Sequence, residues 1–407
     1  MKKLMSLLLL TPFLLNCQSS NNMNVVAEKI DGVVTVDYPS VKDSVTYKLS
    51  DLVEDLEYVQ LDSAIKHYSN WTRMVSDNYI IAEKQGGSLK LFSRKSGKFI
   101  ANVGAVGRGS GEYLFAIQCK FHEATQTILV SSFNSSGSVI YIYDINGKFI
   151  KHLPLAEANY ASFNNFSIDS DGNITILSIE RNVQDAKIRI VRQDYEGNEL
   201  QRLDIENSDN FNTTDIVSSG EGYIAYVIND YKEAKNVSLS RYNFKDNSSE
   251  ESFNVILDDL NGEQSDTKST ISYFETANLF FATKYDTRII VSNDGNSVGK
   301  TMETRDIIVV DKDNLTGGSI RVEDDIFGYP IDRLHVTSKL SQSPGYFIST
   351  IDAITLVETL ERLKEERGES LSTKVIKNID KLISEIDIEG NSVIMYGVTV
   401  SAMPYCK

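Results

Sequence analysis

Positive charge is scarce in this 407-residue sequence. It contains 41 lysine and arginine residues against 57 aspartate and glutamate residues, which gives a net charge of −16. Nucleic acids and anionic membrane surfaces both attract basic proteins, so we expect neither to be a partner of the folded chain. Long hydrophobic runs are also missing, because the apolar stretch at residues 4–15 is too short to span a bilayer.

Cysteine and histidine are rare, with three and four residues. No C-x-x-C, H-x-H or H-x-x-x-H pair occurs, so we predict no metal, no cofactor and no catalytic residue set. Cys119 lies in an alternating apolar segment and Cys406 is the penultimate residue. An exported protein could join them, but we expect two free thiols.

Only six prolines occur, whereas tyrosine (20) and phenylalanine (17) are plentiful in short alternating runs, which favours strands. A strand–turn–strand unit recurs every 50 residues, with its turns at Gly97, Gly147, Gly197 and Asn247. Two further short strands precede each copy. A four-stranded antiparallel unit of about 45–50 residues is the size of one β-propeller blade.

The sequence therefore predicts an all-β fold, a six-bladed β-propeller of four-stranded antiparallel blades. Five or seven blades remain alternatives, because the fifth is poorly delimited around an apparently irregular insertion at residues 284–304. Amphipathic stripes predict a helical insertion in the last blade at residues 353–386, packed on the propeller. That blade shows only three strands near the C-terminus, including one at 332–339. An isolated strand at 55–62 can close the ring as the fourth.

The N-terminus has the pattern of a targeting segment. Lys2 and Lys3 precede the apolar run, and Cys17 follows it directly. This resembles a bacterial lipoprotein signal, in which the cysteine becomes the lipid-attachment residue; an ordinary cleaved signal peptide is the alternative. We therefore expect a signal peptide at 1–16, a polar tether at 17–44 and one propeller domain at 45–407.

A glycine-rich stretch at residues 104–113, GAVGRGSGEY, joins the first strand pair to the next blade. It resembles a segment of the six-bladed β-propeller lipoproteins of Bacteroidetes-type bacteria, which are distant relatives of NHL-repeat propellers. The matching residues are Gly107, Gly109, Gly111, Glu112 and Tyr113. This resemblance implies a fold and a place in the cell envelope, but no reaction.

Loops on one face of the ring hold the candidate binding residues, because ligands of propellers usually bind there. The candidates are Arg108, Glu112, Tyr113, Arg181, Asp230 and Tyr231. Alternatively, Glu112 and Tyr113 lock the glycine-rich loop by hydrogen bonds while its glycines permit positive φ. The repeated turns lie at the outer edges of the blades, where we expect the least contact with a ligand.

Our preferred functional hypothesis is a lipid-anchored extracytoplasmic binding module with a protein or glycan partner in the envelope. A propeller enzyme, such as a lyase or hydrolase with an axial active site, is the alternative, and a structural subunit of an envelope complex is a third. Residues 18–22 lack an acidic run, which favours the outer membrane facing the periplasm over the cell surface.

Overall fold

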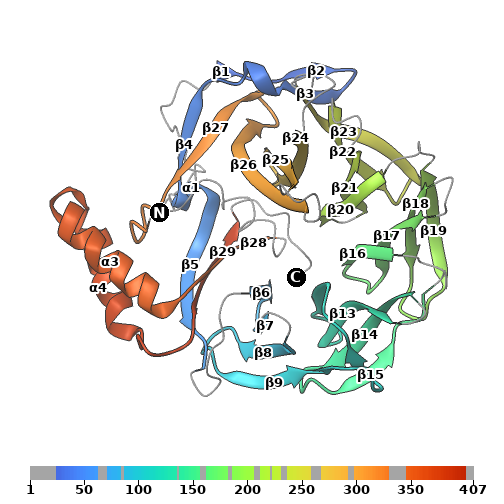
Figure 1. Ribbon diagram of the computed structural model, residues 1–407, viewed down its shortest axis with the longest axis horizontal. Coiled ribbons are helices and arrows are strands. Elements are labelled where there is room, and N and C mark those ends of the chain that lie inside the picture. The colour runs from blue at the N-terminus through green and yellow to red at the C-terminus, as the bar shows by residue number, and fades with distance from the viewer. Residues whose placement is uncertain are drawn as a thin grey trace, which may run out of the picture.

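The computed structural model is a ring of β-sheets arranged as six blades around a central axis (Figure 1). The six-bladed architecture predicted from the 50-residue period is therefore confirmed. The structure describes residues 24–62, 71–83, 87–134, 137–155, 162–181, 186–205, 211–220, 222–230, 236–257, 267–291, 298–329 and 345–399.

The first three blades are four-stranded antiparallel sheets whose strands follow the predicted runs. Blade 1 contains β6 (Trp71–Val75), β7 (Tyr79–Glu83), β8 (Leu89–Ser93) and β9 (Phe99–Val103). Blade 2 contains β12 (Gln118–His122), β13 (Thr127–Asn134), β14 (Gly137–Asp144) and β15 (Phe149–His152). Blade 3 contains β16 (Ser162–Ile168), β17 (Ile174–Arg181), β18 (Ala186–Gln193) and β19 (Glu199–Ile205). Between blades 1 and 2, β10 (Ala105–Val106) and β11 (Glu112–Tyr113) form a short parallel pair.

The next two blades repeat this plan. Blade 4 contains β20 (Phe211–Gly220), β21 (Tyr223–Asp230), β22 (Asn236–Asn243) and β23 (Ser248–Ile256). Blade 5 contains β24 (Thr267–Glu275), β25 (Leu279–Val291), β26 (Val298–Asp311) and β27 (Thr316–Glu323). The prediction of an irregular insertion at residues 284–304 is wrong for the part that the structure describes. There β25 and β26 pair as far as Val291–Val298, because β-branched residues in this segment favour a long hairpin.

The N-terminal segment wraps the rim of blades 4 and 5 (Figure 1). It forms β1 (Asn24–Val25), β2 (Glu28–Ile30), β3 (Val33–Asp37), η1 (Tyr38–Ser40), β4 (Ser44–Lys48) and α1 (Leu49–Leu52). β3 pairs in parallel with β23, and β4 pairs in parallel with β27. The polar tether predicted at 17–44 is therefore wrong from residue 24 onward. Val34 and Val36 are buried between the blades, and the pairing covers two sheet edges.

The last blade joins both ends of the chain. Within the described residues it consists of β28 (Tyr346–Ile351), β29 (Val393–Thr399) and β5 (Val53–Gln60), with β5 antiparallel to β29. The closing strand predicted at 55–62 is thus confirmed as the outer strand of this blade. The strand expected at 332–339 lies outside the described residues.

Two helices connect β28 to β29 and lie outside the ring (Figure 1). They are α3 (Ala353–Arg367) and α4 (Thr373–Glu385), with the short η3 (Gly368–Ser370) between them. The side chains of Asp352 and Ser372 cap their N-termini. The apolar faces of both helices are buried against the last blade, so the predicted insertion and its packing are confirmed. No helix in the described part of the chain is long and apolar enough to cross a bilayer.

The apolar core is a set of clusters between adjacent blades, because each blade buries side chains on both faces. At the seam between the last and the first blade, Val59, Ile348 and Ile394 pack against Ile80 and Phe92. Cys119 is a free, buried thiol between blades 1 and 2, as predicted, and burial raises its pKa to about 12. Cys406 lies outside the described residues.

The repeated turns connect neighbouring blades. Gly97, Gly147, Gly197 and Asn247 all have positive φ, from 51° to 88°. The carbonyl oxygen of Gly97 accepts a hydrogen bond from Asp62 N (2.9 Å), and that of Gly147 accepts one from Gly104 N (3.1 Å). The turns at Gly97 and Gly147 therefore rest on the end of the outer strand of the preceding blade, as well as joining two strands of their own.

Candidate functional site

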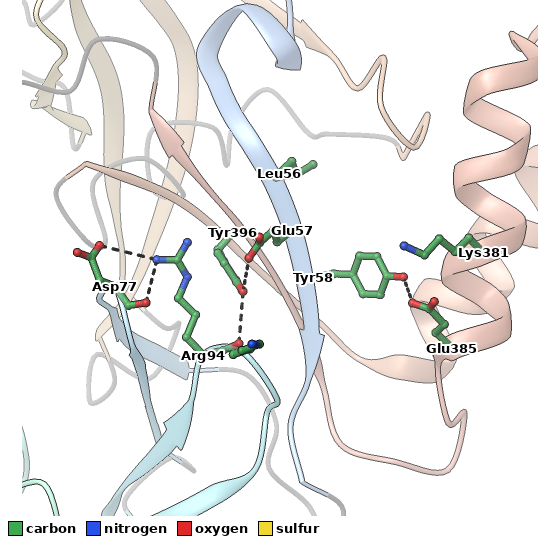
Figure 2. Close-up of a pocket in the computed structure, with 9 residues that line it drawn as sticks. Leu56, Glu57, Tyr58, Asp77, Arg94, Lys381, Glu385 and Tyr396 are labelled. Carbon is green, nitrogen blue, oxygen red and sulfur yellow. Dashed lines mark hydrogen bonds and ion pairs between the residues drawn. The ribbon is translucent and has the colours of Figure 1, made fainter.

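A cleft of about 640 Å³ lies where the last blade meets the first, beside the two helices (Figure 2). We call it the closure cleft. Its volume is within the range of ordinary ligand sites, about 300–1,000 Å³. β5, β29, α4 and the β6–β7 and β8–β9 turns supply its lining, which consists of Leu56, Glu57, Tyr58, Asp77, Arg94, Lys95, Lys381, Glu385 and Tyr396.

A β-bulge shapes β5 beside the cleft. Glu57 pairs with Tyr396 and Glu54 pairs with Val398, so two residues of β5 oppose Gly397. One of them, Asp55, has a φ of 48°. A side chain at Gly397 would come within 2.8 Å of the Glu54 carbonyl oxygen, so this position requires glycine. Bulges bend a strand and change the direction of its side chains, and this one lies directly before Glu57 and Tyr58.

Arg94 is the most firmly held cation of the cleft. Its Nη1 donates to Ser76 O at 3.1 Å and lies 3.9 Å from Asp77 Oδ1. Its guanidinium carbon lies 4.6 Å from the ring centroid of Tyr396 and 5.2 Å from that of Tyr346. Cation–π contact with two rings fixes the guanidinium plane. The side chain remains 16% exposed, so a ligand can reach a positioned arginine.

Each carboxylate of the cleft accepts a hydrogen bond from a tyrosine. Tyr396 donates to Glu57 Oε2 at 2.8 Å, and Tyr346 donates to Asp77 Oδ1 at 2.6 Å. Tyr58 donates to Glu385 across the space between β5 and α4 (Figure 2). Burial, with the Glu57 bond, raises the pKa of Tyr396 to about 12, and burial with the carboxylate bonds also raises the pKa of Tyr346 and Tyr58. All three tyrosines therefore stay protonated donors at physiological pH.

Lys95 and Lys381 complete the charged lining, and both are exposed. Neither forms an ion pair with any residue in the described part of the chain. The cleft thus contains three cations and three carboxylates, in a protein whose net charge is −16. A ligand can reach lysine donors here that have no carboxylate partner within the described structure.

Blade 5 provides an internal comparison for Arg94. Arg94 N donates to Asn78 O at 2.9 Å, and Lys312 N donates to Asn278 O at 2.9 Å, so the two residues occupy equivalent turn positions. Lys312 forms an ion pair with the buried Glu275 at 2.8 Å. In blade 1, Val75 occupies the position of Glu275. The equivalent site in blade 5 is therefore neutralised internally, whereas Arg94 faces an open cleft.

Comparison with known proteins assigns this chain to a family. Residues 32–397 match the family described as Domain of unknown function (DUF4934). The chain belongs to this family. No curated protein matches it.

Solved structures resemble this DUF4934 chain to different degrees. A Bacteroides fragilis protein described as exported matches with a TM-score of 0.52 and 16% identity, over 87% of this chain and 99% of its own. A functionally unknown Desulfotomaculum acetoxidans protein matches with a TM-score of 0.35 and 14% identity, over 63% of this chain and 82% of its own. The Neurospora crassa Pan2 WD40 domain has a TM-score of 0.35 and 11% identity, over 64% and 70%.

The glycine-rich loop of this DUF4934 chain is locked from within. Glu112 Oε2 accepts a hydrogen bond from Gly109 N at 2.7 Å, and the backbone oxygen of Tyr113 accepts one from Gly107 N at 3.0 Å. Tyr113 is fully buried, and its hydroxyl donates to Val103 O at 2.9 Å. The structural role considered for Glu112 and Tyr113 is confirmed, while Arg108 remains exposed on the loop.

The other predicted binding residues lie away from the closure cleft. Arg181 ends β17, where its backbone pairs with Ala186, and Asp230 ends β21 opposite Phe211. Tyr231 and Cys17 lie outside the described residues. None of the described loop candidates lines the closure cleft, so their contact with a ligand stays a prediction.

A second charged group lies on the first strands of the blades, nearest the axis (Figure 1). Arg73 Nε on β6 donates to the buried Glu83 at 2.8 Å. Lys120 lies on β12, where burial lowers its pKa against the opposing effect of Cys119 and of Asp215 on β20. Among the described residues, no group of three His, Cys, Asp or Glu side chains could hold a metal ion.

Sequence reasoning missed the closure cleft because it placed the repeated turns far from any ligand. One signal was available in the 50-residue period. Three residues before the turn glycine, blades 2 and 3 have Asp144 and Asp194, whose Oδ1 atoms accept backbone hydrogen bonds within the turn. Blade 1 has Arg94 at that position. In the folded turn of blade 1, Ser93 takes the place of that aspartate, because its N donates to Lys98 O, so the arginine marks this copy of the turn as different.

Proposed function

We propose that this chain is an exported, lipid-anchored propeller of the cell envelope that binds a ligand in its closure cleft. The observation that carries the binding proposal is Arg94, which contacts two tyrosine rings and is still open to a ligand. Export is supported by the Bacteroides fragilis structure described as exported, and anchoring by Cys17 directly after a short apolar run. The proposed location is the outer membrane facing the periplasm, with a protein or glycan partner.

The chemistry of the cleft favours binding over catalysis. A nucleophile or general base needs a neighbouring group that activates it. Instead, Glu57, Asp77 and Glu385 each accept a tyrosine hydroxyl, and the tyrosines are held protonated. Among the described residues that line the cleft there is no cysteine, serine or histidine. The lining offers charge, hydrogen bonds and aromatic surface, which are the means of recognition.

The anchoring part of the proposal predicts the fate of a Cys17→Ala variant. Wild-type protein is expected in the membrane fraction after cell lysis, because an attached lipid contributes about 0.8 kcal/mol per buried CH₂ group. The variant is expected in the soluble or secreted fraction. Immunoblotting of the fractions measures where each protein lies, and labelling with a radioactive fatty acid measures whether it carries a lipid. A Cys119→Ala variant is the matched control and should stay with the membrane. Equal membrane retention of all three proteins would contradict lipid anchoring at Cys17.

The binding part predicts the effect of Arg94→Lys on retention by a printed array of glycans and short peptides. Lysine can keep the hydrogen bond to the Ser76 carbonyl, as Lys312 does with Thr276 O in blade 5 (2.6 Å), so the variant should fold. It loses the planar group stacked on Tyr346 and Tyr396. We expect any compound retained by wild type to bind about tenfold more weakly, a loss of about 1.4 kcal/mol.

The control for this experiment is Lys245→Arg, at the exposed turn position of blade 4 that corresponds to Lys95. It should bind like wild type. If the array retained no class of compound, or if retention were unchanged in Arg94→Lys, the closure cleft would not be the binding site.

An enzyme with an axial site is the second candidate, and Lys120 is the observation that favours it. A lysine whose pKa is lowered by burial can act as a nucleophile or base. This candidate predicts turnover of a bound glycan or peptide that is lost in Lys120→Met and kept in Arg94→Lys. The binding proposal predicts no turnover in the wild type, in Lys120→Met or in Arg94→Lys.

A further inference from the structure

The carboxylates of the closure cleft are partly satisfied by the protein itself. Glu57 and Asp77 each accept one tyrosine hydroxyl on a single carboxylate oxygen. A carboxylate has about four acceptor positions, so each retains acceptor capacity toward the cleft. These residues can therefore accept hydrogen bonds from neutral donors, such as hydroxyl groups, without requiring a cationic ligand.

The cations of the cleft are less satisfied than the carboxylates. Arg94 lies 3.9 Å from Asp77, which is long for an ion pair, and its shorter hydrogen bond goes to a backbone carbonyl. Lys95 and Lys381 have no ion-pair partner in the described structure, and each ammonium has three donors. Figure 2 shows Lys381 on α4 directed toward Tyr58 on β5, so cationic donors enter the cleft from both sides of β5. An anionic group is the ligand that satisfies them.

We propose that the closure cleft binds an acidic saccharide. Its carboxylate or sulfate contacts Lys95 and Arg94, its hydroxyl groups donate to Glu57 and Asp77, and Lys381 donates to the ligand from the other side of β5. This inference rests on the proposed binding function and assigns its ligand class. Leu56 and the half-buried ring of Tyr58 supply apolar surface for the body of the ligand.

Hydroxyl groups distinguish this ligand from other anions. A simple anion would satisfy the lysines but would be repelled by Glu57, Asp77 and Glu385 at the same site. A sugar acid carries one negative charge together with several O–H donors, which match acceptor carboxylates beside cations. A diacidic peptide such as acetyl-Glu-Glu-amide carries a second negative charge near those carboxylates, and its neutral donors are amide N–H groups held along its backbone. The lining therefore favours the saccharide.

Calorimetric titration of the full-length protein tests the assignment with four probes: glucuronate, glucose 6-sulfate, glucose and the peptide acetyl-Glu-Glu-amide. We expect the acidic sugar with the higher affinity to bind at least tenfold more tightly than glucose. Comparing glucuronate with glucose 6-sulfate shows whether the cleft prefers a carboxylate or a sulfate. The preference should shrink as salt rises, because screening weakens exposed charge pairs. The Lys95→Gln/Lys381→Gln double variant should lose about tenfold in affinity for the acidic sugar and little for glucose.

Matched control lysines are available on the same elements. Lys245 occupies the turn position equivalent to Lys95 in blade 4, and Lys377 lies one turn before Lys381 on α4; both are exposed. The Lys245→Gln/Lys377→Gln variant removes the same net charge and should keep the preference. An equal loss in both double variants would show a nonspecific charge effect and overturn the assignment.

Two further outcomes overturn the ligand class while leaving the binding proposal intact. Equal binding of glucose and its acidic forms, with binding still weakened in Arg94→Lys, would reject an acidic ligand. Tighter binding of the peptide than of any sugar, or an array ligand of another class with no sugar binding, would reject the saccharide. Loss of all binding on the array would instead remove the proposed function itself.

Discussion

Replacing Gly147 by alanine is expected to lower the free energy of unfolding by about 3 kcal/mol or more. Two effects add. Gly147 has a φ of 74°, where a residue with a Cβ is strained by about 1–2 kcal/mol. That Cβ would also overlap the main-chain carbonyl oxygen of Asn102 on β9, and relieving such an overlap costs about 1–3 kcal/mol. The obstructing atom is backbone, so the two blades must move apart.

Gly222→Ala is the matched control. Gly222 also lies in a hairpin turn with positive φ, 85°, but nothing lies within 4 Å of the position of its Cβ. It should lose only the strain contribution of about 1–2 kcal/mol. Urea unfolding followed by circular dichroism measures both variants. Equal losses would show that contact with the preceding blade adds nothing, and that the turns act only within their own blades.

These turns illustrate what the sequence could predict about the fold. The 50-residue period predicted the four-stranded blade and four of its copies, because apolar alternation and positive-φ residues are local signals. The contact of the Gly147 turn with β9 is not local, since Asn102 belongs to the preceding blade. The closing strand could be predicted because the last blade had only three predicted strands and needed a fourth. The wrapping of the N-terminal segment could not, because an outer strand edge accepts another strand without any marker in its own sequence.

The closure cleft was hidden for the same physical reason. Its lining comes from β5, the turns of blade 1, α4 and β29, and its outermost residues, Leu56 and Tyr396, lie 340 positions apart in the sequence. In the sequence, each of these tyrosines, lysines and acids is ordinary when it is considered alone. Their chemistry depends on being brought together, and only the irregularity at Arg94 was visible beforehand. By contrast, the hydrogen bonds of Glu112 within its own loop span three residues and could be anticipated.

Replacing Glu275 by glutamine is expected to lower the free energy of unfolding by about 3 kcal/mol. The Glu275 side chain is 3% exposed and pairs with Lys312 at 2.8 Å and with Arg241 at 2.7 Å. Its other oxygen accepts a hydrogen bond from Ser218, 2.7 Å away, which links β20 to β24. Glutamine has nearly the same shape but no charge. The variant therefore leaves two partly buried cations without their shared carboxylate.

A double-mutant cycle separates the ion pair from simple packing. In a Lys312→Met background, Glu275→Gln should destabilise the protein less, by about 1 kcal/mol or more, because one of the two unpaired cations is already gone. The exposed Glu250→Gln on β23 is the matched control and should change stability by less than about 0.5 kcal/mol. Identical effects of Glu275→Gln in both backgrounds would contradict the coupling.

Acid stability provides an independent test of Glu275. Burial alone would raise its pKa, but Lys312 and Arg241 outweigh burial and hold the pKa below the ordinary value. As pH falls below about 4.3, the unfolded chain therefore takes up a proton at this position before the folded protein does. The stability that this carboxylate contributes is fully present above that pH and is lost as pH falls through the folded pKa. Between pH 6 and pH 3, the free energy of unfolding should therefore fall less steeply in Glu275→Gln than in wild type. Parallel curves would show that the buried charge cluster does not stabilise the junction between blades 4 and 5.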